Sequence, residues 1–136
     1  MKNMLHTIQI IFTAIGGYIG WLMGGFDGFM YALLAFVAID YITGLMVAVL
    51  EKKLSSDIGF RGIFKKILIF IMVGIGNIID TYLIKDGSAI RTAVIFFYLS
   101  NEGISILENT GKIGLPIPEK LKKALEQLNK EDKSNE

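Results

Sequence analysis

Charged and amide side chains interrupt several long apolar runs in this chain. A carboxylate or guanidinium among apolar residues must bind a partner, hold a proton or line water, because an unpaired charge is costly there. Side chains three, four or seven residues apart on a helix share a face, so these polar groups are expected to gather on a few faces. The candidates for polar groups that lie inside a membrane or face a lumen are Asp40, Thr43, Asn77, Asp80, Arg91, Asn101 and Glu102.

The sequence offers little material for catalysis. It contains no cysteine, which excludes disulfides, thiolate metal sites and cysteine nucleophiles together. The single histidine, His6, lies near the N-terminus, where we expect it to be solvated rather than part of a Ser-His-Asp site. We therefore expect no enzyme, no catalytic residue, no cofactor and no metal site.

Composition indicates a membrane protein. Of the 136 residues, 52% are hydrophobic, which is high for a soluble domain of this size. Between Leu5 and Leu50 the only Asp, Glu, Lys or Arg side chains are Asp27 and Asp40, so the first third is expected to face lipid. The net charge of +1 is small, and the lysines cluster beside apolar runs, so we expect a lipid bilayer as partner and no nucleic acid.

Four apolar segments approach the roughly 20 residues that a helix needs to cross hydrocarbon. They cover about residues 7–25, 29–50, 67–84 and 89–107. A cleaved signal peptide is the rival explanation for the first segment, but it is too long and no A-x-A-like site follows it. The fourth is amphipathic, because Arg91, Glu102 and Asn109 fall on nearly one helical face. It spans if that face is buried and lies in the interface if it is not; spanning is favoured.

A basic interval between the second and third segments predicts the orientation. Lys- and Arg-rich short loops stay on the cytoplasmic side, and four spans then place both termini of a multi-pass membrane protein in the cytoplasm. Within residues 51–66, the segment 54–57 looks like the start of a short interfacial helix, which Gly59 and Gly62 are expected to interrupt. The residues expected to set the topology are Lys52, Lys53, Arg61, Lys65 and Lys66.

Three glycines in the first segment could form a helix-packing seam. Gly16, Gly20 and Gly24 fall four residues apart, which places them in one groove of a helix and would let another backbone approach closely. Glycine is also simply common in membrane helices. Both explanations remain open on the sequence alone.

Two charged residues that flank the turn between the third and fourth segments suggest an ion pair. Folding the third and fourth segments about the turn between Asp86 and Gly87 brings Asp80 and Arg91 to similar depth. We expect the two side chains to pair, since removal of either would leave a buried charge.

The predicted fold is an all-α membrane protein with four transmembrane helices, the fourth amphipathic, plus a short cytoplasmic amphipathic helix. Residues 1–114 form the expected transmembrane helical domain, and residues 115–136 a cytoplasmic charged tail. Pro118 can open the tail helix. Its apolar stripe would consist of Leu121, Ala124, Leu125 and Leu128.

Three stretches carry a resemblance to a known family. They are residues 40–44 (DYITG), residues 54–66 (LSSDIGFRGIFKK) and residues 101–121 (NEGISILENTGKIGLPIPEKL). The chain resembles the toxin-secretion and phage-lysis holin family over nearly its whole length. The resemblance implies a homo-oligomer in the bacterial cytoplasmic membrane that opens lesions. An endolysin or a toxin leaves through them as cargo, without necessarily binding the protein.

Two other functions remain open on the residues themselves. Buried acids could serve a small proton-coupled exporter subunit, in which a membrane carboxylate exchanges protons for a cation. A passive scaffold is the third class, and it would tolerate neutral replacement of Asp40. Without the resemblance, the residues support only a small helical protein with several membrane spans.

Overall fold

A computed structural model describes the backbone of residues 1–134 and the side chains of residues 1–128. Every regular element in this part of the chain is helical, which confirms the predicted fold class. Four helical stretches are long and apolar enough to cross a membrane, namely α1, α2, α3 together with η1, and α4. The elements are α1 (Lys2–Leu22), α2 (Gly28–Leu50), α3 (Ser56–Ile78), the π-helix η1 (Ile79–Ile84), α4 (Ala89–Ile113) and α5 (Glu119–Ser134).

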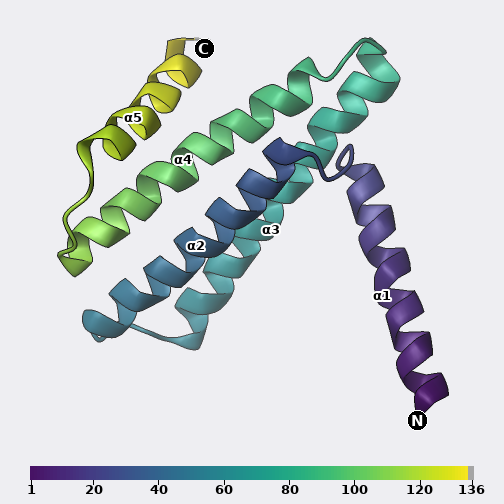
Figure 1. Cartoon of the computed structure of the whole chain (residues 1–136), viewed down its shortest axis with the longest axis horizontal. Coiled ribbons are helices and arrows are strands. Elements are labelled where there is room, and N and C mark those ends of the chain that lie inside the picture. The colour runs from purple at the N-terminus through teal and green to yellow at the C-terminus, as the bar shows by residue number, and fades with distance from the viewer. Residues whose placement is uncertain (135–136) are drawn as a thin grey trace.

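Helices α2, α3 and α4 form a bundle, with α4 packed against both of the others (Figure 1). One end of the bundle carries the turns at residues 23–27 and 85–88, here called the hairpin end. The other end carries the loop at residues 51–55, here called the loop end. Apolar side chains fill the bundle between the two ends, and the buried ones are Met23, Met30, Leu33, Val37, Ile69, Val73, Ile95 and Leu99.

Helix α1 diverges from this bundle (Figure 1). Gly20 is its only buried residue, and large side chains such as Phe12 are mostly exposed. The helix ends at Leu22 because Gly24 and Gly25 adopt left-handed conformations, with φ of 88° and 96°. The expected extension to residue 25 was therefore wrong.

The proposed glycine seam is shorter than expected. Gly24 lies outside α1, and a Cβ atom on Gly20 would fall 2.4 Å from the Phe26 ring, so Phe26 already covers that position. Nothing lies within 4 Å of a Cβ atom placed on Gly16. Only Gly24, outside α1, has side chains of α3 and α4 against it, and a contact between subunits at these glycines stays a prediction.

The third helix begins much earlier than expected. The Ser55 hydroxyl accepts a hydrogen bond from the Ile58 amide at 3.2 Å and caps α3, as the sequence suggested. The helix then continues through Gly59 and Gly62, so the predicted interruption was wrong. These glycines admit Tyr41 of α2: its hydroxyl donates to the Gly59 carbonyl at 3.3 Å, and a Cβ atom on Gly62 would lie 3.1 Å from its ring.

Helix α5 starts directly after Pro118 and packs on α4. Leu125 is buried and Leu128 is half-buried, whereas Leu121 and Ala124 of the predicted stripe are exposed. The contact with the bundle therefore depends mainly on Leu125.

The close approach of α3 and α4 near the hairpin end gives a first prediction. A Cβ atom on Gly76 would lie 3.2 Å from the Arg91 Cα and 3.3 Å from its amide nitrogen. Gly76→Leu should therefore force the helices apart and lower the free energy of unfolding by about 1–3 kcal/mol, measured by SDS titration of detergent-solubilised protein. Gly16→Leu is the matched control, since open space surrounds Gly16; equal losses in both variants would contradict the packing argument.

Candidate functional site: two buried polar clusters

A lysine joins two carboxylates toward the loop end of the bundle. Lys66 of α3 donates through Nζ to the Asp40 carboxylate of α2 and to Glu102 Oε2 of α4, the latter at 2.6 Å. The three side chains are only 18%, 10% and 8% exposed, respectively. This Lys66 cluster therefore ties all three bundle helices together inside the apolar region.

Amide and hydroxyl groups extend the Lys66 cluster. Asn109 of α4 donates through Nδ2 to Asp40 Oδ1 at 3.1 Å and to Thr43 Oγ1 at 3.0 Å. The Thr43 hydroxyl donates to the Ile39 carbonyl at 2.9 Å, which leaves its lone pairs to accept from Asn109. Asp40 thus receives hydrogen bonds from a cation and from an amide.

The second cluster lies at the hairpin end and centres on Arg91, which is 4% exposed. Its Nε donates to the Met23 carbonyl at 2.6 Å, and its Nη2 donates to the Gly25 carbonyl at 3.0 Å. Its terminal nitrogens also donate to both oxygens of Asp27, at 2.8 and 3.3 Å. This Arg91 cluster holds the turn between α1 and α2 against α4, and a charged bidentate pair is among the stronger contacts available.

Asp80 binds Arg91 through the backbone rather than through the guanidinium. Its two oxygens accept from the amides of Ile90 and Arg91 at 3.0 and 2.8 Å. Those are the second and third residues of α4, the positions that an N-cap side chain satisfies, while the local cap residue Ser88 makes no such bond. The prediction that Asp80 and Arg91 lie close together is confirmed, but the predicted ion pair between their side chains is wrong. The Arg91 guanidinium pairs with Asp27 instead.

The π-helical turn presents Asp80 to α4. Its i→i+5 hydrogen bond runs from the Lys85 amide to the Asp80 carbonyl at 2.8 Å, and Lys85 ends the turn with a φ of 61°. Asp80 is 2% exposed within this turn. No pattern in the sequence indicates this π-helix.

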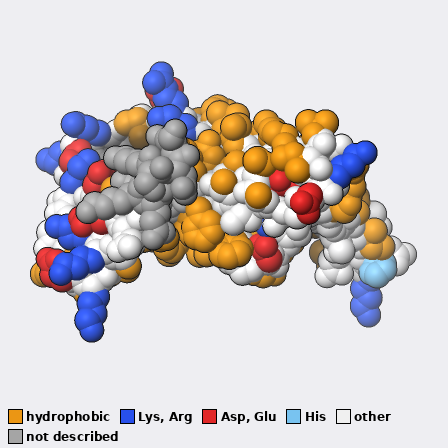
Figure 2. Space-filling view, turned by 90° about the horizontal axis from the view of Figure 1, so that it is seen from above, with side chains coloured by type: hydrophobic (Ala, Val, Ile, Leu, Met, Phe, Trp, Pro, Cys, Tyr) orange, Lys and Arg blue, Asp and Glu red, His pale blue; other side chains and the backbone are white. Residues whose placement is uncertain are grey.

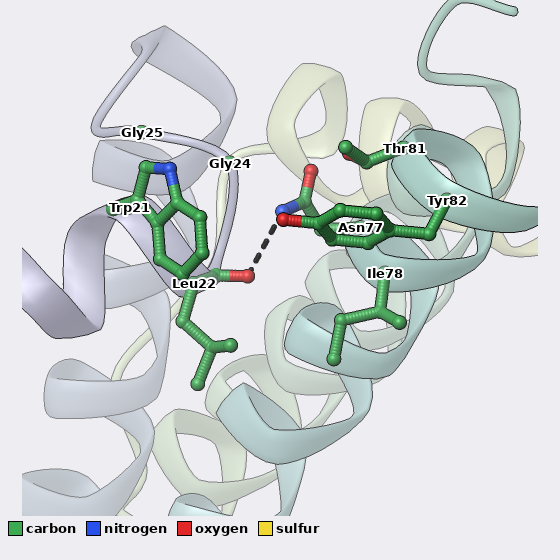
Figure 3. A pocket seen from close by; sticks show the side chains of 8 residues that line it. All are labelled: Trp21, Leu22, Gly24, Gly25, Asn77, Ile78, Thr81 and Tyr82. Carbon is green, nitrogen blue, oxygen red and sulfur yellow. Dashed lines mark hydrogen bonds between the residues drawn. The ribbon is translucent and has the colours of Figure 1, made fainter. Parts of the chain in front are cut away.

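Asn77 completes the attachment of α1. Its Nδ2 donates to the Leu22 carbonyl at 2.9 Å, one of the carbonyls that the end of α1 leaves without a helical partner (Figure 3). A Cβ atom on Gly24 would lie 2.6 Å from Asn77 Oδ1 and 2.6 Å from Arg91 Nε, so this turn needs glycine for space as well as for its φ. Trp21 and Tyr82 flank a pocket of about 360 Å³ beside this contact (Figure 3).

Asp27 lies in the turn before α2 and acts in two ways. Its Oδ1 accepts from the Met30 amide at 2.9 Å and caps α2, while its carboxylate pairs with Arg91. The hydrogen bond from Arg91 is the main cause that holds the pKa of Asp27 below 3.8, against the opposing effect of desolvation.

The remaining predicted residues lie on the surface. Asn101 is exposed on α4, so the structure separates it from its neighbour Glu102. Lys52 and Lys53 are exposed in the loop-end turn, and Arg61 pairs with Asp57 at 3.2 Å on the exposed start of α3. Of the five basic residues assigned to a loop, Lys66 alone reaches the interior.

Internal pairing is the common property of both clusters. Among the described residues, every buried side-chain nitrogen or oxygen atom has a hydrogen-bond partner. No group of three or more His, Cys, Asp or Glu side chains that could hold a metal ion occurs in the same part of the chain. The two clusters join helices, so their role is to hold the helices together, and breaking their bonds would release the helices.

An all-helical chain with four apolar helices of spanning length, whose buried charges are paired across the bundle, defines a small integral membrane protein. A sequence profile of the Bacteriophage holin family matches residues 17–130. The chain belongs to that family.

Relatives support this assignment. An "uncharacterized 14.9 kDa protein in nagH 3′ region" of Clostridium perfringens is 42% identical over 95% of this chain and 98% of its own length. An uncharacterized protein of Listeria monocytogenes is 47% identical over 79% of this chain and 76% of its own length. A "probable holin" of Bacillus phage phi105 is 41% identical over 59% of this chain and 58% of its own length. No solved structure matches the chain.

The Lys66 cluster gives a second prediction. Lys66→Met leaves two buried carboxylates without their cation, and we expect a loss of about 3–5 kcal/mol in the free energy of unfolding, measured by SDS titration. Lys65→Met is the matched control, because Lys65 is exposed and should change stability by no more than about 0.5 kcal/mol. Adding Asp40→Asn and Glu102→Gln to Lys66→Met should restore part of the loss; a triple variant no better than the single variant would contradict the pairing.

The Arg91 cluster gives a third prediction, on pH. Because the pKa of Asp27 is lowered in the folded protein, its ionised form stabilises the fold above pH 3.8, and this stabilisation is lost as the pH falls further. Unfolding midpoints measured from pH about 6 downward should fall more steeply in the wild type than in Asp27→Asn, which keeps the helix cap but not the charge. Parallel curves would show that the Asp27 charge adds nothing.

Proposed function

We propose that this protein is a holin that oligomerises in the bacterial cytoplasmic membrane and opens lesions through it. The observation that carries the proposal is the family match over residues 17–130, on a chain with four candidate spans, three of which are joined by the Lys66 cluster. The name "probable holin" of the phage phi105 relative agrees with it. Lesion formation, rather than a chemical reaction, is then what the protein supplies.

The proposed topology places residues 51–55, both termini and the tail after residue 114 in the cytoplasm. Support comes from the basic residues near the loop end: Lys52, Lys53, Arg61 and Lys65 are all exposed there. The hairpin end then lies on the outer side of the membrane, with Lys85 and the Arg91 cluster. The cargo is an endolysin or a toxin, released without a binding site on this chain.

The polar clusters hold each subunit together before lesions open. Asp40 and Glu102 share Lys66, and Asp80 caps α4, so none of these carboxylates faces lipid. A lumen-facing role for them, or for Asn77, requires these bonds to break when subunits assemble. These residues are therefore first of all contacts that position three helices, and they could line a lumen only in a state in which these bonds have broken.

Inducible expression in a bacterium tests the function. Membrane potential and release of a cytoplasmic enzyme are followed together. A holin should cause an abrupt collapse of the potential and release of the enzyme after a delay, as subunits accumulate. Lys65→Met should keep this behaviour, while Lys66→Met should lose it at equal expression. A maintained potential with saturable transport of one substrate would instead identify an exporter, and no leak at all would identify a scaffold.

A further inference from the structure

Helix α5 packs beside the middle of α4 instead of continuing away from its end (Figure 1). Leu125 of α5 sits over Gly103: a Cβ atom on that glycine would lie 2.8 Å from Leu125 Cδ2 and 3.2 Å from the Phe36 ring of α2. The glycine leaves a notch that Leu125 fills, and a larger residue there would displace it.

The notch lies well inside the bundle. Gly103 precedes Ile113, the last residue of α4, by ten positions, which corresponds to about 15 Å along the helix axis. It directly follows Glu102 of the Lys66 cluster. A helix docked at Gly103 therefore runs beside the part of α4 that crosses the membrane. The tail then enters the membrane region from the cytoplasmic side, which replaces the free cytoplasmic tail of the proposed topology.

The outer face of α5 is too polar for lipid. Between residues 119 and 126 its exposed charged side chains are Glu119, Lys120, Lys122, Lys123 and Glu126. Charged side chains gather at the end of the molecule where α5 begins, whereas apolar ones dominate the middle of the same view (Figure 2). Hydrocarbon would not solvate a row of lysines and glutamates at this depth.

Polar side chains of α4 are exposed on the side of the molecule that carries α5. Asn101 and Glu108 are exposed and seven residues apart, so they share one face of the helix. Glu108 also lines a groove of about 480 Å³ between α4 and α5, together with Lys122 and Glu126. By contrast, the exposed side chains of α1 and α3 include many large apolar ones, such as Phe12, at 71%, and Leu68, at 56%. The molecule thus has one side suited to lipid and one suited to water.

From this asymmetry we propose that the α4–α5 face lines the water-filled interior of the open assembly, with α5 still docked at Gly103. The inference rests on the proposed holin function and specifies which surface of the subunit meets the lumen. This surface needs no internal bond to break, whereas exposure of Asp40 or Glu102 would dismantle the Lys66 cluster. The apolar sides of α1 and α3 then face lipid or neighbouring subunits.

A reversible lock on α5 tests whether it stays docked while lesions are open. The chain has no cysteine of its own, so Gly103→Cys with Leu125→Cys creates a single possible pair. Cells expressing the double variant are oxidised before lysis, free thiols are counted by alkylation and mass spectrometry, and enzyme release is recorded with and without reductant. Each single cysteine variant is the control for oxidation itself.

The expected result is a disulfide in the membrane-bound protein and no loss of enzyme release in the locked state. Failure of the Gly103→Cys/Leu125→Cys pair to form a disulfide in membranes, or release blocked until reductant is added, would overturn the inference. Wild-type cells in the same experiment separate the two proposals. No release from the wild type would refute holin function, whereas release from the wild type but not from locked protein refutes only the lumen surface.

Labelling tests the contact with water directly. In vesicles that carry open assemblies, a membrane-impermeant thiol reagent should label Lys123→Cys on α5 rapidly. Ile71→Cys, on the exposed apolar face of α3, should stay protected. Equal protection of both positions would place the α5 face away from water and overturn the proposal.

Discussion

The pairing of charges across the apolar bundle is the constraint on which the remaining structure depends. Lys66 must reach carboxylates on two other helices, and Arg91 must reach the turn between α1 and α2. A shift of one helix along the axis of its neighbour would leave a charge unpaired among apolar side chains. The register of α2, α3 and α4 is therefore fixed by polar contacts, although apolar side chains fill the bundle between the two clusters.

The spacing of these groups along the sequence matches this role. Arg91 and Glu102 are eleven residues apart on α4, and Lys66 and Asn77 are eleven apart on the third helix. Eleven residues of helix rise about 17 Å and complete three turns, so both clusters meet the same side of the bundle at two depths. The apolar core lies between them. None of the ion pairs among the described residues involves α1. This helix diverges from the bundle (Figure 1), and the hydrogen bond from Asn77 to the Leu22 carbonyl attaches its C-terminal end.

Much of this organisation could be predicted from the sequence, because apolar runs and helical periodicity report directly on spans and faces. The shared face of Arg91, Glu102 and Asn109 is an example. Partner identity was harder. The sequence places Lys66 in a loop because it ends the basic interval 51–66 between two apolar runs, where Gly59 and Gly62 are expected to interrupt a helix. In the structure these glycines lie within α3 and admit Tyr41. Asp27 gave no sign of pairing with Arg91, since 64 residues separate them and only the packed bundle brings them together.

Each cluster contains two carboxylates and one cation, and the second carboxylate is satisfied in a different way in each. Asp80 accepts from two backbone amides at the start of α4, where the helix dipole favours a negative charge. Asp40 accepts from the Asn109 amide in addition to Lys66. Asn109 lies on α4 and Asp40 on α2, so separating these two helices would remove this donor together with the ion pairs between them. Separating η1 from α4 would remove the amide donors to Asp80. The subunit thus opens as a unit or remains closed, and a water-filled interior is most easily lined by the surface that takes no part in either cluster, the face formed by α4 and α5.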